Sequence, residues 1–290
     1  MAGTYSASTP RPSGNICSNA KHQSWPPPLT KLPAALTIPL ALASLAYLNA
    51  RASLSTDYPL LSAYIRGYAG LHRALKRDRL NSFYILEEQA RSPTISNHTF
   101  LIYGGRSWTY RQAYEQVLQW AGWLKKRGVG KGEVVGLCMM NCEEFVWCWF
   151  ALWSLGARPA FINYNLSGRP LVHCIKTSTA RLVVVEEEVA GSFSGDVRTE
   201  LEGVDVVVVD GGVRREIAST EAVREPDEAR AGPIKRDMAA LIYTSGTTGL
   251  PKPAVVSWQK ARVGAGLVGT WLPLRKNDIL YTVRGRPFPL

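Results

Sequence analysis

The chain has 290 residues, of which 46% are hydrophobic and 20% are charged, with 25 Gly and 18 Pro. This composition excludes a disordered tail, a coiled coil and a collagen, and the length allows one large domain or two ordinary ones. The formal net charge is +11, but the first 80 residues hold nine Lys/Arg against two Asp, so +7 of it lies at the N-terminus. A basic groove through a folded domain is therefore not indicated, and we expect no nucleic-acid partner.

Two N-terminal segments differ sharply in composition. Residues 1–32 are rich in Ser, Pro, Thr and Asn, which predicts a flexible polar tail. Residues 33–50 carry no charge, and about 18 helical residues at ~1.5 Å each approach the thickness of a bilayer's hydrocarbon core. We expect a hydrophobic membrane helix here, spanning or monotopic. A buried core helix or a re-entrant segment is the alternative, because Pro39 and many alanines interrupt the leucines.

Residues 51–80 combine an apolar stripe with a cluster of cations. The stripe recurs at helical spacing and comprises Leu60, Leu61, Tyr64, Ile65, Tyr68, Leu71 and Leu75. The cations are Arg66, Arg73, Lys76, Arg77 and Arg79. This pattern predicts a basic amphipathic juxtamembrane helix with membrane lipid as a partner, and a solvated helix packed on the body is the alternative. The positive-inside tendency predicts a membrane-associated protein whose residues 51–290 are cytosolic, with endoplasmic reticulum, peroxisome and plasma membrane left open.

Residues 81–290 alternate short apolar runs with helical stretches. Strands are predicted over 100–103, 107–109, 134–138, 159–163, 182–185, 204–209 and 239–244. Thr109 with Gln112 forms a capping box that begins a helix ending at Gly128, and Asn141 with two glutamates begins a second helix. Most strands are apolar throughout, as strands covered on both faces require. We predict an α/β fold with a mainly parallel sheet and flanking helices.

The five cysteines are odd in number and contain no C-x-x-C pair. They are typical of buried, reduced thiols in an intracellular protein. Neither paired Cys nor paired His occurs at zinc-ligand spacing, so no metal site is predicted.

The most informative stretch is 243–252. It places hydroxyl side chains, two glycines and a lysine behind an apolar strand: Tyr243, Thr244, Ser245, Gly246, Thr247, Thr248, Gly249 and Lys252. Glycines let successive N–H groups turn to one side, the hydroxyls add donors, and the lysine supplies a mobile positive charge. Donors to a charged oxygen contribute about 1.5–3 kcal/mol each, so a handful can hold a triphosphate. The alternative is a flexible surface turn, which the specificity of the whole pattern disfavours.

Two other glycine patterns are excluded. The loop is no Walker A motif, because Gly246 is not followed five residues later by Gly-Lys-Ser/Thr. Residues 264–269 read G-x-G-x-x-G, but Gln-Lys-Ala-Arg precedes them where a dinucleotide site needs an apolar strand. A small-residue helix packed closely on the sheet is predicted there instead.

Residues 243–252 resemble the signature loop of the adenylate-forming enzymes, which include acyl-CoA synthetases, coumarate-CoA ligases, luciferases and adenylation domains. Within that superfamily the chain is most similar to the very-long-chain acyl-CoA synthetase and fatty acid transport protein branch. The branch resemblance is carried by 160–166, by 171–178 and by the hydrophobic N-terminal segment, and the likeness runs from about 33 to 282. It implies an incomplete AMP-binding domain over 81–290.

The resemblance also implies a reaction and its cofactors. A fatty carboxylate would attack the α-phosphate of Mg²⁺-bound ATP, giving acyl-adenylate and pyrophosphate, and CoA thiolate would then displace AMP. The loop residues named above match those that hold the β- and γ-phosphates and stabilise the leaving pyrophosphate. His173 lies in a family-like stretch, where we expect a structural histidine.

After Thr282 the likeness ends, and the family's later motifs, including its catalytic lysine, are absent. The resemblance therefore implies a truncated form that by itself makes no acyl-CoA, with catalytic residues beyond its C-terminus. Coupling to fatty acid uptake stays open. So do two alternatives: a CoA ligase for another carboxylic acid, and a non-catalytic membrane-bound fragment for lipid uptake or interaction. Neither acyl-chain length nor oligomeric state can be read from the sequence.

Overall fold

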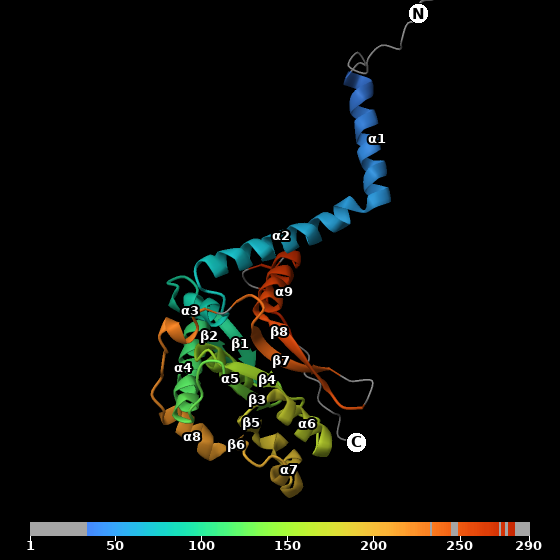
Figure 1. Cartoon of the computed structure of the whole chain (residues 1–290). Helices are drawn as coiled ribbons and strands as arrows, with labels where there is room; N and C mark the ends of the chain where they lie inside the picture. The colour runs from blue at the N-terminus through green and yellow to red at the C-terminus, as the bar shows by residue number, and fades with distance from the viewer. Residues whose placement is uncertain (1–33, 233, 245–248, 273, 276–277, 282–290) are drawn as a thin grey trace, which may run out of the picture. The chain divides into compact units, whose positions relative to one another are not determined.

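The computed structural model describes residues 34–232, 234–244, 249–272, 274–275 and 278–281 (Figure 1). The chain divides into two compact units, 1–55 and 56–290. In the first unit, helix α1 spans Ala34–Ala52 and contains Pro39. Of the helices in the described ranges, none is both long enough and apolar enough to cross a membrane. The prediction of a spanning helix over 33–50 is therefore not supported, since alanines and polar residues such as Asn49 dilute its leucines.

The second unit is built on a six-stranded sheet with strand order β6-β5-β3-β4-β7-β8. The strands are β3 (Val134–Cys138), β4 (Arg158–Phe161), β5 (Leu182–Glu186), β6 (Asp205–Val209), β7 (Met238–Thr244) and β8 (Lys252–Ser257). The first five pair in parallel, and β8 returns antiparallel to β7. The α/β fold with a mainly parallel sheet is confirmed. Strand β8 was not predicted from the sequence.

Helices cover both faces of this sheet (Figure 1). The helices are α3 (Phe83–Arg91), α4 (Tyr110–Lys126), α5 (Glu143–Ser154), α6 (Gly168–Ser178), α7 (Gly195–Glu200), α8 (Gly211–Ser219), η2 (Glu187–Ser192) and η3 (Asp227–Ala229). Strand β5 shows why its valines run without interruption: Leu182 and Val184 join the core beneath α4 and α5, whereas Val183 and Val185 join the core beneath α6 and α7. A strand buried on both faces needs apolar side chains at every position.

Local signals set most element boundaries. The capping box of Thr109 and Gln112 is present at the start of α4, and Gly128 follows that helix with φ of 79°, as predicted. Helix α5 begins one residue later than predicted, with Cys142 rather than Asn141 at its N-cap and no side-chain capping bond. Instead, the two glutamates of its first turn place negative charge at the positive end of the helix dipole, which stabilises the helix. Strands β1 (Thr99–Tyr103) and β2 (Arg106–Thr109) form the predicted hairpin.

The G-x-G-x-x-G segment lies in helix α9 (Trp258–Trp271), which contacts β7 and β8. Its small residues also let it approach helix α2 (Leu54–Lys76) closely. A Cβ at Gly266 would lie 3.0 Å from the Cα of Gly67. The predicted small-residue helix is therefore confirmed, and one of its close neighbours is another glycine.

A buried carboxylate ties the 220–232 connection to the helices. The side chain of Glu87 is 5% exposed; its Oε1 accepts hydrogen bonds from Tyr114 Oη at 2.8 Å and Arg224 Nε at 2.6 Å. Arg224 also reaches Asp227 at 2.6 Å, and Asp227 pairs with Arg79 at 2.8 Å. Burial by itself raises the pKa of Glu87, but the hydrogen bonds from Arg224 and Tyr114 outweigh it and the pKa is lowered.

Candidate functional site

The predicted phosphate loop connects β7 to β8 at the carboxyl edge of the parallel strands. Ser245, Gly246, Thr247 and Thr248 lie outside the described residues. Its two ends are described: Thr244 is the register partner of Lys252, and the Thr244 hydroxyl donates to the Lys252 carbonyl at 3.4 Å. Strands β7 and β8 therefore form an antiparallel pair, and Thr244 and Lys252, two residues of the predicted site, face each other at its end.

Gly249 has φ of +85°, in the left-handed region. A Cβ at this position would meet no atom within 4 Å, so the glycine is required by the backbone conformation and not by lack of space. This agrees with the sequence-based reason for a glycine at this point of an anion-binding loop.

Helix α6 holds both stems of the loop. On the β7 side, the Tyr243 hydroxyl donates to the carbonyl of Cys174 at 2.6 Å and lies 3.3 Å from the Thr177 hydroxyl. On the β8 side, Nε2 of His173 donates to the carbonyl of Pro251 at 3.1 Å. His173 is thus a hydrogen-bonded structural histidine, as predicted.

Tyr243 therefore faces α6 rather than the turn. Burial raises the pKa of Tyr243, so its hydroxyl stays protonated and able to donate. The positioning role of Cys174 and Thr177 was missed from the sequence. Thr177 lies four residues after His173 and so shares its face of α6. Cys174 contributes only its backbone carbonyl, which no side-chain pattern marks.

Lys252 is the cation at the end of this loop. Its side chain is exposed and forms no ion pair or hydrogen bond with any residue in the described ranges. By contrast, Arg214 and Arg127 are each paired with glutamates. An unpaired ammonium beside a left-handed glycine and a run of hydroxyl residues suits a polyphosphate, whose oxygens accept several donors at once. The described part of the loop therefore fits the phosphates of a nucleotide.

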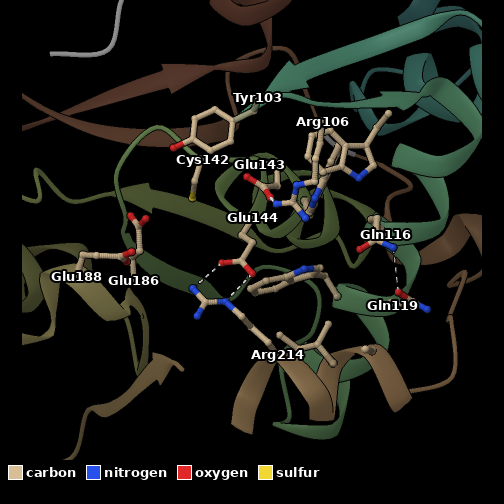
Figure 2. A pocket seen from close by; sticks show the side chains of 15 residues that line it. Tyr103, Arg106, Gln116, Gln119, Cys142, Glu143, Glu144, Glu186, Glu188 and Arg214 are labelled. Atoms are coloured by element: carbon tan, nitrogen blue, oxygen red, sulfur yellow. Dashed lines mark hydrogen bonds and ion pairs between the residues drawn. The ribbon is translucent and has the colours of Figure 1, made fainter. Parts of the chain in front are cut away.

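A second polar region lies at the same edge of the sheet, beside β3 and β5. A cavity of about 480 Å³ lies here, and its lining side chains are drawn in Figure 2: Tyr103, Arg106, Trp108, Gln116, Gln119, Trp120, Cys142, Glu143, Glu144, Trp147, Glu186, Glu188, Arg214, Ile217 and Ala218. Its carboxylates outnumber its guanidinium groups by four to two. Glu143 pairs with Arg106, and Glu144 accepts from Arg214 Nε at 2.9 Å. The surplus negative charge disfavours phosphate binding in this cavity, so the β7–β8 loop is the better candidate for the phosphate site.

The side chains near this edge of the sheet do not favour a reactive thiol or a metal site. Burial raises the pKa of Cys138 and of Cys142 to about 12 and that of Cys174 to about 11, so these thiols stay protonated. Within the described ranges, no three His, Cys, Asp or Glu side chains are grouped to hold a metal ion.

Comparison with known proteins agrees with this fold. The family model of the AMP-binding enzymes matches residues 86–281, more than half of the chain. The chain therefore belongs to the AMP-binding enzymes, the adenylate-forming superfamily.

Relatives place it in the fatty acid branch of that superfamily. It is 31% identical over 250 residues to a very long-chain fatty acid transport protein of Cochliobolus heterostrophus, an alignment covering 83% of this chain and 38% of that protein. It is 33% identical to the medium/long-chain-fatty-acid–CoA ligase FadD6 of Mycobacterium tuberculosis, covering 67% of this chain and 32% of that one. The chain thus spans about a third of the length of these curated relatives.

Solved structures show the same architecture. The anthranilate CoA ligase AuaEII, in complex with anthranoyl-AMP, matches with a TM-score of 0.52 and 28% identity over 62% of this chain and 34% of that chain. A fatty acyl CoA synthetase of Mycobacterium tuberculosis matches with a TM-score of 0.52 and 22% identity, over 62% and 35%. The second likeness concerns the fold alone.

Proposed function

We propose that residues 243–252 form the phosphate-binding loop of an ATP-dependent, AMP-forming ligase that converts a long- or very-long-chain fatty acid to acyl-CoA. One observation carries the proposal. Two stems fixed to α6 present an unpaired Lys252 and a left-handed Gly249 at the carboxyl edge of a parallel sheet. The printed names of the fatty acid relatives supply the substrate class.

In the proposed reaction, the fatty carboxylate oxygen bonds to the α-phosphorus of ATP while the bond to the pyrophosphate oxygen breaks. Charge grows on the departing pyrophosphate, and Lys252 with Thr244 and the loop amides stabilises it electrostatically. CoA thiolate then attacks the acyl carbon, and AMP leaves. Mg²⁺ would enter on the oxygens of the nucleotide, since no three His, Cys, Asp or Glu side chains of the described residues are placed to hold a metal ion.

Another carboxylic acid is the second candidate substrate. The likeness to anthranilate CoA ligase, and 35% identity over 150 residues to a 2-succinylbenzoate–CoA ligase of Geobacillus kaustophilus, favour it. Acid-dependent exchange of pyrophosphate into ATP separates the two, run on a protein that contains these residues and has the length of the relatives. Stimulation by long-chain acids supports the proposal, and stimulation only by aromatic acids overturns the fatty acid assignment. No stimulation by any acid would favour a non-catalytic role in lipid uptake.

A further inference from the structure

Helix α2 has two separate apolar stripes where the sequence predicted one. The first is buried and contains Ala63, Gly67, Leu71 and Ala74, spaced three or four residues apart. The second is exposed and contains Tyr58, Leu61, Tyr64, Ile65 and Tyr68, with exposed fractions between 37% and 70%. A helix in water does not keep a row of large exposed apolar side chains without cost, so the second stripe needs an explanation.

The buried stripe already accounts for the packing of α2 on its own unit. Helix α2 runs beside α9 (Figure 1). Gly67 lies against Val263 and Gly266 of α9, and the Tyr68 hydroxyl accepts from Gln259 Nε2 at 3.0 Å. Leu71 enters the main core. These contacts fix which face of α2 points inward. Tyr68 borders α9, whereas Tyr58, Leu61 and Ile65 are 56–70% exposed and are left to a partner outside the folded unit.

Arg66 lies within the span of the exposed stripe, and the other cations follow it at the C-terminal end of α2. Arg66, Lys76 and Arg77 are exposed and form no ion pair with the described residues, and Arg73 donates only to the carbonyl of Ala69 in its own helix. Asp57 is the one carboxylate within α2. Arg79, just beyond the helix, is by contrast neutralised by Asp227. Uncompensated cations therefore flank an apolar and tyrosine-rich surface.

We propose that the exposed face of α2 docks on the surface of an anionic bilayer, with Leu61, Ile65 and the tyrosines at the level of the headgroups and the cations against lipid phosphates. Charge complementarity selects this partner: an anionic leaflet supplies both the apolar layer and the negative charge that this face lacks. Tyrosine rings suit the interface because one end is apolar and the other polar. The proposal does not depend on the ligase reaction or on α1.

The test is co-sedimentation of the whole 290-residue chain with vesicles of phosphatidylcholine, or of phosphatidylcholine in which part is replaced by phosphatidylserine. We expect stronger binding to the anionic vesicles and weakening by salt. Replacing Arg66, Lys76 and Arg77 by Gln should lower the partition coefficient about fivefold per cation on anionic vesicles. Ile65→Asp should lower it on both kinds of vesicle.

Matched controls keep the test specific. Ile102→Asp on the β1–β2 hairpin and Arg215→Gln on α8 alter equally exposed residues far from α2 in sequence, and should leave binding unchanged. Leu42→Asp and Leu45→Asp probe α1, whose residues 34–50 carry no charge and cannot produce a preference for anionic lipid. Equal binding to neutral and anionic vesicles would overturn the proposal. So would α2 variants that bind like wild type, or that lose self-association instead of lipid binding.

Discussion

The carbonyl oxygen of Pro251 accepts a hydrogen bond from Nε2 of His173 at 3.1 Å, across 78 positions of sequence. This bond ties the end of the phosphate loop to α6, one residue before Lys252. Together with the bond from Tyr243 to the Cys174 carbonyl, it fixes the distance between the two stems without using any group of the turn itself.

His173→Ala should therefore weaken MgATP binding while the fold persists. One hydrogen bond of about 1 kcal/mol corresponds to roughly a fivefold loss of affinity if the loop must be ordered on binding. Titration calorimetry with MgATP measures the change. His72→Ala, an exposed histidine of α2, is the control, and an equal loss in both variants would argue against a positioning role for His173.

Gly249→Ala should strain the loop, because φ of +85° costs a residue with a Cβ about 1–2 kcal/mol. Gly203→Ala imposes the same strain at φ of +83°, after α7 and away from the loop. Thermal unfolding should show both variants less stable by a few degrees. Only Gly249→Ala should also lower the affinity for MgATP, and the same affinity in both variants would contradict the role given to this glycine.

Gly266→Ala should destabilise the chain relative to Gly264→Ala by about 1–3 kcal/mol, because its Cβ would lie 3.0 Å from the Cα of Gly67. A Cβ at Gly264 meets nothing within 4 Å, and alanine there should add helix propensity. Urea unfolding of the two variants gives the difference. Equal stability would mean that α2 and α9 do not pack through these glycines.

Glu87 should make the fold sensitive to acid. Its pKa is lowered from the ordinary value of 4.5, so its contribution to stability is full above that value and is lost as pH falls through the lowered pKa. Unfolding free energies measured between pH 7 and pH 3 should decline below about pH 4.5.

The substitution Glu87→Gln isolates this contribution. It should cost about 3 kcal/mol at pH 7, since it removes the buried partner of Arg224, and should flatten the decline at low pH. Glu115→Gln, exposed on α4, is the control and should change neither quantity. An unchanged pH profile in Glu87→Gln would show that other carboxylates cause the acid sensitivity.

Much of the fold follows from the sequence because buried parallel strands require unbroken apolar runs. Val134–Cys138 was predicted with the boundaries observed, and Thr109 with Gln112 marked the start of α4. Strand β8 was missed because Lys252 and Pro253 begin it at a sheet edge, where one side of the strand needs no ladder partner. The single stripe predicted for α2 proved to be two, since periodicity shows spacing but not which side another helix will cover.

The loop of the candidate site was predicted from the sequence, but the contacts that anchor it to α6 were not. Glycine, hydroxyl and lysine residues in one short run reveal an anion loop, because the chemistry is local to that run. The anchoring by His173 and Thr177 joins residues more than 60 positions apart, and no local pattern encodes such a pairing.

The most direct test of the phosphate-binding loop is to measure the binding of MgATP and of magnesium pyrophosphate to the whole chain. The variant is Lys252→Ala, and the control is Lys126→Ala, which changes an exposed lysine of α4. We predict that both ligands bind the wild type and the control alike, and that Lys252→Ala loses about tenfold or more for each, as expected for one charge-assisted contact of 1.5–3 kcal/mol. If the two lysine variants bound both ligands with the same affinity as the wild type, the assignment of this loop to the nucleotide phosphates would be contradicted.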